Sequence, residues 1–282
     1  MEIFKQIAPL RAYLKIQKER KLSIGLVPTM GALHPGHLTL IGNSRAENDL
    51  TVCSIYVNPT QFNNASDLAK YPRLLEKDSA MLEEAGCDVL FAPANEAMYA
   101  AASELKMDFG DLDKILEGKF RPGHFSGVGL VVSKLFNIVQ PDVAYFGQKD
   151  YQQFAVITRL KEELLFDLRL KAVPIVREKD GLAMSSRNMR LAPDQRQRAI
   201  VFYQSLLLAK SLLEQGKSWK QIEEEVKRKC EAQPEVKLEY IALADRKNLN
   251  PLNNVTDRSA AVLLIAGYVG EIRLIDNLLL EE

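Results

Sequence analysis

The chain of 282 residues is long enough to enclose a large hydrophobic core, and its length favours about two domains. Basic and acidic residues number 37 each, so the formal net charge is zero and the charge balance does not favour nucleic acid as a partner. The longest strongly apolar stretch, residues 260–267, is too short to cross a membrane. The N-terminus lacks the layout of a signal peptide, and the three cysteines share no metal or redox spacing. We therefore expect a reduced, cytoplasmic protein.

Strand and helix signals alternate through the first two thirds of the chain. Apolar, β-branched stretches predict strands, and amphipathic stretches predict helices. We expect strands at 23–27, 50–57, 89–91, 143–146 and 168–173, and helices at 35–48, 73–85, 126–138 and 151–164. Near-continuous apolar strands separated by helices favour an α/β fold with a parallel sheet covered on both faces.

The pattern changes after Asn188. Two helices are expected at 193–215 and 218–233, and two strands at 238–244 and 260–268. This order favours a small α+β second domain, with a boundary somewhere between Val176 and Asn188. We therefore divide the chain into domains 1–176 and 177–282.

Two of the three histidines lie three residues apart, in the sequence His34-Pro35-Gly36-His37, at the turn from a predicted strand to a predicted helix. Free backbone N–H groups and the positive end of the helix dipole make such a turn an anion site. The turn is similar to the His-x-Gly-His signature with which class I aminoacyl-tRNA synthetases and related nucleotidyltransferases hold ATP. A metal half-site and a helix-capping accident are the alternatives. For a metal, the chain offers only His124 and three scattered cysteines as further ligands.

A second strand, glycine turn and helix follow at Gly147-Gln148-Lys149-Asp150. Gly147 permits a close backbone approach, and Lys149 would place an ammonium group near phosphates. Asp150 suits a helix N-cap or a ribose-hydroxyl acceptor. A surface turn with solvated charges is the alternative.

Two further polar segments carry groups that suit the same kind of ligand. Met184-Ser185-Ser186-Arg187 offers hydroxyls and a guanidinium for polyphosphate oxygens, and it is similar to the mobile Lys-Met-Ser-Lys-Ser loop of the synthetases, although the first lysine is absent. Asn58 and Gln61 end a predicted strand with neutral amides that could bind a hydroxylated carboxylate. The alternatives are a polar interdomain linker and an asparagine-capped turn.

Several familiar signatures are missing. The sequence contains no Gly-x-x-x-x-Gly-Lys-Ser/Thr loop and no Gly-x-Gly-x-x-Gly fingerprint, which argues against a P-loop ATPase and a nicotinamide dehydrogenase. It contains no Gly-x-Ser-x-Gly elbow either, so an α/β-hydrolase is not expected.

Taken together and in order, five stretches closely resemble the motifs of the pantothenate synthetase (pantoate–β-alanine ligase) family. They are residues 27–38, 56–62, 123–132, 145–153 and 184–188. The resemblance implies a Rossmann-like parallel sheet of the class I nucleotidyltransferase type, with the smaller C-terminal domain closing over the active site. It implies that pantoate attacks the α-phosphorus of ATP to give pantoyl adenylate and pyrophosphate. The amine of β-alanine then attacks the acyl carbon, releasing pantothenate and AMP.

The resemblance also implies residue roles. His34, His37 and Lys149 are expected to be catalytic, with His37 as the proton donor. Gln61, Gln153 and Asn58 are expected to bind pantoate and β-alanine. Residues expected to contact ATP are Met30, Gly31, Ala32, Leu33, His34, Pro35, Gly36, His37, Gly147, Gln148, Lys149, Asp150, Val176 (adenine), Met184, Ser185, Ser186 and Arg187. Magnesium is expected to bridge the phosphates, with Asp78 as one candidate ligand, and the family's enzymes are usually homodimers.

Three other functions remain open at this point. The nearest is another nucleotidyltransferase of the same fold, acting on a phosphate-bearing substrate. A tRNA-charging enzyme would need a basic surface, yet residues 188–282 carry equal numbers of acidic and basic side chains. A non-catalytic nucleotide sensor would not need both histidines together with Lys149.

Overall fold

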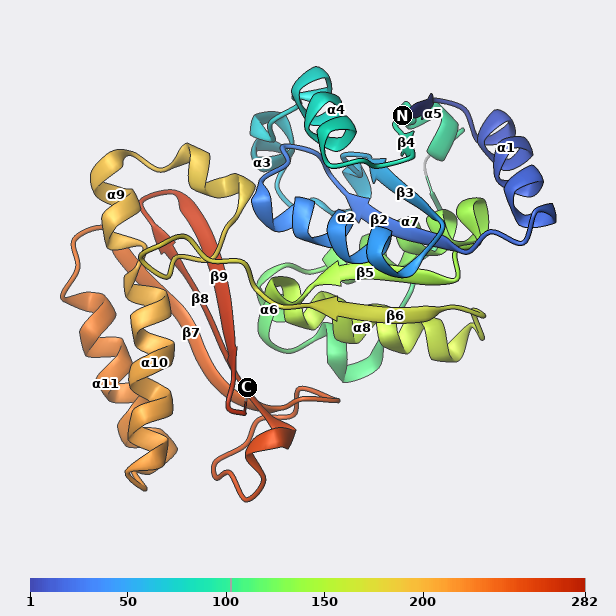
Figure 1. Cartoon of the computed structure of the whole chain (residues 1–282). Helices are drawn as coiled ribbons and strands as arrows, with labels where there is room; N and C mark the ends of the chain where they lie inside the picture. Colours follow the sequence, from blue (N-terminus) through green and yellow to red (C-terminus); the bar gives the residue numbers. More distant parts are fainter. Residues whose placement is uncertain (102, 282) are drawn as a thin grey trace. The chain divides into compact units, whose positions relative to one another are not determined.

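The computed structural model describes residues 1–101 and 103–281, and these fall into two compact units (Figure 1). The N-terminal unit comprises Met1–Gln148 and Gln152–Pro174, and the C-terminal unit comprises Lys149–Tyr151 and Ile175–Glu282. The main crossing between the units thus follows Pro174, whereas the sequence-based division put it after Val176. The short segment Lys149–Tyr151 groups with the C-terminal unit, although the residues on both sides of it in the sequence belong to the N-terminal unit.

A six-stranded sheet forms the centre of the N-terminal unit, with the strand order β1-β4-β3-β2-β5-β6. Every neighbouring pair is parallel, which confirms the predicted parallel sheet. The strands are β1 (Glu2–Phe4), β2 (Ile24–Thr29), β3 (Leu50–Ile55), β4 (Val89–Phe91), β5 (Val143–Gly147) and β6 (Arg169–Val173). The five strands expected from the sequence are all present; the short edge strand β1 was not predicted.

Helices cover both faces of this sheet. They are α1 (Ile7–Glu19), α2 (Pro35–Glu47), α3 (Ala65–Lys70), α4 (Leu75–Glu84), α5 (Asn95–Met98), α6 (Leu116–Phe120), α7 (His124–Val139) and α8 (Tyr151–Glu163), with the short 3₁₀ turns η1 (Pro59–Gln61), η2 (Gly110–Asp113) and η3 (Gln148–Asp150). α2 packs against β2, β3, β5 and α4, whereas α7 packs against β2 and α1. Figure 1 shows α4 and α8 on opposite sides of the sheet. Because both faces are covered, the strands are apolar almost throughout.

The order of the strands determines where the polar turns meet. β2 lies between β3 and β5; the chain proceeds from β2 to β3 and β4 towards one edge and from β5 to β6 towards the other. Open parallel sheets bind ligands beyond the carboxyl ends of their strands, where the winding direction reverses. Residues 30–37 and 58–61 follow β2 and β3, and residues 147–148 lie at the end of β5 and directly after it. The sheet therefore brings these three predicted segments to one edge.

The C-terminal unit has an antiparallel sheet in the order β7-β8-β9. Its elements are β7 (Val236–Asp245), β8 (Ala261–Val269), β9 (Ile272–Leu279), α9 (Pro193–Arg198), α10 (Val201–Glu214), α11 (Trp219–Glu231), η4 (Ser186–Arg190) and η5 (Arg258–Ala260). α10 packs against β8 and β9, and α11 packs against β7. The core between them includes Phe202, Leu206, Ile222 and Leu263, which are all fully buried or nearly so. The predicted α+β character of this unit is confirmed.

Two details of the C-terminal unit differ from the prediction. The single helix expected at 193–215 is wrong, because a tight turn separates α9 from α10: the Phe202 N–H bonds to the Ala199 carbonyl, three residues back. β9 was missed, although Gly270, with φ of 56°, and Glu271 form the two-residue connection typical of a β-hairpin. Among the described residues, no helix combines the length and the apolar character that a membrane span requires.

Candidate active site

The turn between β2 and α2 carries the two predicted histidines. β2 ends at Thr29, and α2 begins at Pro35 with His34 at the N-cap position. Between them, Gly31 and Ala32 have positive φ angles of 80° and 50°. A left-handed conformation is unfavourable for a residue with a Cβ, such as Ala32. Another interaction must therefore hold this turn.

That interaction comes from Asp78 in the first turn of α4. Its Oδ2 accepts a hydrogen bond from the Ala32 N–H and its Oδ1 one from the Leu33 N–H, each at 2.8 Å. The side chain is only 1% exposed, so both charge-assisted bonds form away from water, where they are strong. Each carboxylate oxygen thus holds a backbone amide of the turn, a use different from the magnesium contact that the sequence suggested.

His34 and His37 lie close together at the start of α2. Their ring centroids are 4.0 Å apart and their planes are inclined by 37°. Both side chains are partly buried. The first turn of a helix also presents backbone N–H groups and the positive end of the dipole. The histidine pair and these amides make a set of donors that suits an anion such as a phosphate group.

The turn after β3 holds Asn58 and Gln61 in a buried network. Asn58 Nδ2 donates to Gln61 Oε1 at 3.2 Å and to the Gly127 carbonyl at 3.1 Å. Asn58 Oδ1 accepts from the Thr60 hydroxyl at 3.0 Å. Gln61 Nε2 lies 2.9 Å from Met30 Sδ, which links this turn to the end of β2. Asn58 is 1% exposed, so its amide makes its hydrogen bonds inside the protein.

A second layer of side chains supports Asn58. The Tyr99 hydroxyl donates to Asn58 Oδ1 at 3.0 Å. Lys134 Nζ lies 4.0 Å from the centroid of the Tyr99 ring and donates to the Met98 carbonyl. Burial raises the pKa of the Tyr99 hydroxyl and lowers the pKa of the Lys134 ammonium, because both ionised forms lose water. The amide of Asn58 is therefore fixed from several directions.

α7 approaches this turn so closely that only glycine fits at residue 127. A Cβ on Gly127 would lie 2.3 Å from the Thr60 carbonyl oxygen. Three residues earlier, His124 Nδ1 lies 2.8 Å from the Gln61 carbonyl oxygen. Since a carbonyl only accepts, Nδ1 carries the proton in this contact. The backbone of Gln61 is thus held by α7 as well.

α8 carries two adjacent glutamines that the structure uses differently. Gln152 is 2% exposed; its Nε2 donates to the Leu112 and Ile115 carbonyls at 2.7 and 3.0 Å, and its Oε1 accepts from the Glu117 N–H at 2.9 Å. Gln153 is partly exposed. Successive helical residues point in different directions. Gln152 therefore holds the segment before α7, whereas Gln153 can reach a ligand.

The remaining predicted ATP residues belong to the C-terminal unit, apart from Gly147 and Gln148. Val176 and Met184 are the two ends of a short hairpin, which is closed by a hydrogen bond of 3.0 Å from the Met184 N–H to the Val176 carbonyl. Ser185 follows at once and caps η4, its Oγ accepting from the Arg187 N–H at 3.3 Å. The structure thus brings residues 176 and 184–187 together within this unit.

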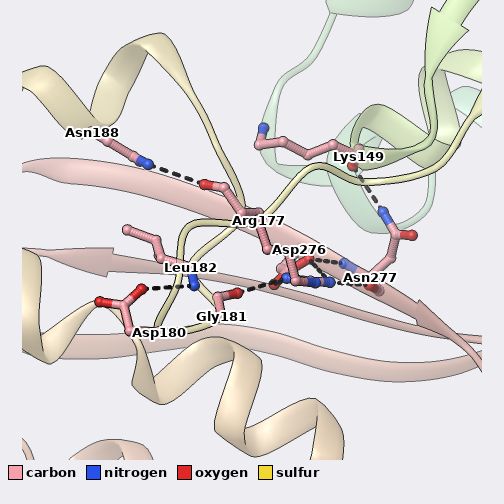
Figure 2. A network of polar contacts seen from close by, with 9 residues as sticks. Lys149, Arg177, Asp180, Gly181, Leu182, Asn188, Asp276 and Asn277 are labelled. Carbon is pink, nitrogen blue, oxygen red and sulfur yellow. Dashed lines mark hydrogen bonds and ion pairs between the residues drawn. The ribbon is translucent and has the colours of Figure 1, made fainter. Parts of the chain in front are cut away.

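Lys149 is held by the C-terminal sheet. Its carbonyl accepts a hydrogen bond of 2.9 Å from Asn277 Nδ2 (Figure 2). Its Nζ lies 4.0 Å from the Asp150 carboxylate. The Tyr151 hydroxyl donates to the Arg246 carbonyl at 3.3 Å. The segment Lys149–Tyr151 is therefore fixed to this unit at both ends.

The described residues contain no cluster of three or more histidine, cysteine, aspartate or glutamate side chains that could hold a metal ion. His124, which the sequence offered as a further metal ligand, is bonded to the Gln61 backbone instead.

An open parallel sheet whose winding reverses between β2 and β5, with a His-x-Gly-His turn entering a helix at that edge, defines an α/β nucleotide-binding protein of the class I nucleotidyltransferase type. The family model described as pantoate-beta-alanine ligase matches residues 2–279. The chain belongs to the pantoate–β-alanine ligase family, as its motifs predicted.

Relatives and solved structures agree over the full length. The chain is 47% identical to the pantothenate synthetase of Moorella thermoacetica, covering 100% of this chain and 99% of the relative. It is 43% identical to the pantothenate synthetase of Thermus thermophilus, whose crystal structure matches with a TM-score of 0.93 and full coverage of both chains. The pantoate-beta-alanine ligase of Francisella tularensis, solved in complex with beta-gamma ATP and beta-alanine, is 35% identical, with a TM-score of 0.83 and coverage of 100% and 98%.

Sequence reasoning missed most of the residues that hold this site. The contact of Asp78 with the turn joins positions 46 apart, and no local pattern signals it. Gln152 was passed over in favour of its neighbour. The dipeptide Asp276-Asn277 lies in β9, which was not predicted at all. The hairpin signal at Gly270 would have revealed that strand, but not its contact with Lys149.

Replacing Asp78 by asparagine tests the turn. The substitution keeps the shape but turns one acceptor into an NH₂ group that faces a backbone N–H of Ala32 or Leu33. We expect the free energy of unfolding, measured by urea denaturation, to fall by about 1–3 kcal/mol. The control Asp111→Asn changes an exposed carboxylate and should leave the stability unchanged. Equal stability of the Asp78 variant and the wild type would show that the carboxylate does not hold the turn.

Proposed function

We propose that the chain condenses pantoate with β-alanine, consuming ATP and releasing AMP and pyrophosphate, through a pantoyl-adenylate intermediate. The observation that carries the proposal is the His34–His37 turn at the start of α2, in a chain that belongs to the pantoate–β-alanine ligase family along its length. The Francisella tularensis structure with beta-gamma ATP and beta-alanine supports ATP and β-alanine as ligands.

In the first step, a carboxylate oxygen of pantoate bonds to the α-phosphorus, and the bond from that phosphorus to the bridging oxygen of pyrophosphate breaks. Such a step needs charge neutralisation and in-line positioning more than acid–base chemistry. We assign the imidazoles of His34 and His37 and the first amides of α2 to the phosphates. His37 donates a proton to the departing pyrophosphate. The contact of Asp78 sets the direction of this turn and so acts through it.

Further positive charge comes from two side chains. We assign the ammonium of Lys149 and the guanidinium of Arg187 to the triphosphate, together with the hydroxyls of Ser185 and Ser186. Arginine suits phosphate because its donors form a planar fork, whereas lysine acts as a point charge. Asp150 accepts from the ribose hydroxyls.

The remaining ATP contacts are mainly made by backbone. Val176 contacts adenine, and Met30–Leu33, Pro35, Gly36, Gly147, Gln148 and Met184 line the nucleotide. A Cβ on Gly147 would meet no described protein atom within 4 Å, so protein packing does not require glycine there. A close approach of the nucleotide to the backbone supplies the reason.

The acid substrate is bound by neutral amides. We assign Gln61 and Gln153 to the hydroxyls and carboxylate of pantoate, with Gln61 also near the β-alanine site. Asn58 is buried and bonded to Gln61 Oε1, so we assign it the task of orienting Gln61 rather than contacting substrate. Neutral amides avoid the desolvation of a charged partner when the acid binds.

In the second step, the neutral amine of β-alanine bonds to the acyl carbon, and the bond from that carbon to the phosphate oxygen breaks, so that AMP takes the electron pair. The nitrogen gives up one proton to water as the amide forms. Magnesium, which the family resemblance implies, would neutralise charge on the phosphates of ATP. We assign it no protein ligand, because the Asp78 carboxylate holds the Ala32 and Leu33 amides. A homodimer and closure of the C-terminal domain belong to the proposal on the family resemblance alone. A cytoplasmic location belongs to it on the cysteine spacing and the N-terminal sequence.

Exchange of labelled pyrophosphate into ATP tests the reaction. In the presence of magnesium and without β-alanine, we expect exchange only when pantoate is added, because the adenylate step alone is reversible under these conditions. Formation of pantothenate on adding β-alanine then checks the second step. Exchange without pantoate, or none with it although ATP binds, would contradict the proposed reaction and point to a different acceptor.

Replacing His37 by alanine tests the proton donor. We expect the rate of pantoate-dependent exchange to fall at least about 100-fold, which is the scale of general acid catalysis. The melting temperature should stay close to that of the wild type, because the ring is only partly buried. A variant that exchanges at the wild-type rate would remove His37 from the mechanism.

Replacing Gln153 by alanine tests the pantoate contact. We expect the KM for pantoate to rise about tenfold, equivalent to about 1.4 kcal/mol of lost binding, while the KM for ATP stays nearly constant. Gln233→Ala removes an exposed amide elsewhere and serves as the matched control. An equal rise of both constants would argue against the assigned role.

A further inference from the structure

An ion pair between partly buried Arg177 and buried Asp276 joins the hairpin of residues 176–184 to β9. Arg177 Nη1 and Nη2 contact the two carboxylate oxygens of Asp276 at 2.6 and 2.9 Å. The guanidinium also lies 3.9 Å from the centre of the Tyr203 ring. Asp276 is 5% exposed; burial raises its pKa, although the positive charge of Arg177 opposes this effect.

Further hydrogen bonds from Arg177 lock the hairpin itself. Nη1 donates to the Gly181 carbonyl at 3.1 Å, and Nη2 donates to the Asn277 carbonyl at 3.1 Å (Figure 2). One guanidinium thus ties the hairpin tip to two successive residues of β9. Because Val176 and Met184 are the two ends of that hairpin, the residues that we assign to adenine and triphosphate share this anchor.

The side chain of Asn277 points to a different segment. It is 1% exposed, and its Nδ2 donates to the Lys149 carbonyl at 2.9 Å. Its backbone N–H bonds to Asp276 Oδ1 at 2.8 Å, so the Asp276 carboxylate also holds the backbone of Asn277. The dipeptide Asp276-Asn277 therefore joins the Lys149 segment and the hairpin at one point of the C-terminal unit (Figure 2).

Stability alone does not explain these polar residues. Neighbouring residues of a strand normally point to opposite faces, yet Asp276 and Asn277 are both buried. Replacing a buried ion pair by apolar side chains is often neutral or stabilising, because desolvation offsets the attraction. Asp276 and Asn277 make hydrogen bonds that apolar side chains could not make. These bonds fix the position of the Lys149 backbone and of the Arg177 side chain.

We infer that Asn277 is a positioning residue for Lys149, and that the ion pair of Asp276 with Arg177 holds the same point of β9 to the hairpin that carries Val176 and Met184. We assign neither β9 side chain a contact with the nucleotide. This inference rests on the proposed function, because it concerns where the ammonium of Lys149 meets the phosphates. A displacement of about 1 Å at such a group can cost about 100-fold in rate.

A double-mutant cycle tests the inference in the full-length protein. We compare the wild type with Asn277→Ala, Lys149→Ala and the double variant in pantoate-dependent pyrophosphate exchange. We expect Asn277→Ala to lower kcat about tenfold and to leave the KM for pantoate nearly unchanged. In the Lys149→Ala background, the same substitution should have no further effect on kcat, because its effect is transmitted through Lys149.

The control is Asn253→Ala, which removes an exposed amide from the same unit and should keep the wild-type kcat. Melting temperatures show whether each variant folds. If Asn277→Ala does not fold, Tyr151→Phe serves in its place, because it removes only the hydroxyl that holds the other end of the segment. That variant should lower kcat about threefold, again only when Lys149 is present.

Additive effects in the cycle, or a folded variant with the wild-type kcat, would overturn the inference. Absence of exchange in the wild type would instead contradict the proposed function. In that event, the ATP affinities of the same four proteins are measured by calorimetry and compared in place of kcat. A loss of affinity in Asn277→Ala that is absent in the Lys149→Ala background would still support the positioning role, and additive losses would overturn it.

Discussion

The site depends first on one buried carboxylate. Asp78 supplies one oxygen to each of two successive amides, at Ala32 and Leu33, and so stabilises a left-handed turn that the backbone would otherwise avoid. The direction of the chain at His34 follows from that turn, and with it the start of α2. A carboxylate at this place also adds negative charge near an anion site. Its two hydrogen bonds reduce that cost, because they distribute the charge over backbone amides.

The same principle recurs around the other predicted ligand groups. Asn58 and Gln152 are buried amides whose hydrogen-bonding groups are occupied inside the protein, next to the glutamines that we assign to pantoate. Each such network is costly to leave incomplete, because an unmet buried polar group loses its water without compensation. We expect these networks to fix the orientation of the side chains that contact substrate. The residues that provide this support do not themselves contact the substrate. This arrangement explains why the structure contains more polar burial near the site than the sequence motifs alone require.

Much of this could be predicted from the sequence, because strand ends and motif spacing are local properties. The parallel sheet, the position of the His34 turn and the polar residues after β3 and β5 all follow from periodicity and from the residues at strand ends. The assignment of residues to ATP and pantoate stays a prediction. What the sequence did not reveal are contacts between distant segments: Asp78 with Ala32, His124 with Gln61, and Asn277 with Lys149. Such contacts depend on how elements pack, and a single sequence shows only which residues could make them.

The assignment of Lys149–Tyr151 to the C-terminal unit has a consequence for building chimeras from members of this family. A C-terminal unit transplanted as one continuous stretch from Ile175 onwards would arrive without the three residues that it normally holds. Asn277 Nδ2 of the transplanted unit would then face the carbonyl of residue 149 from the recipient protein. A successful exchange should therefore carry two segments, the tripeptide and the C-terminal stretch, since the two are in contact in the folded protein although they are separate in the sequence.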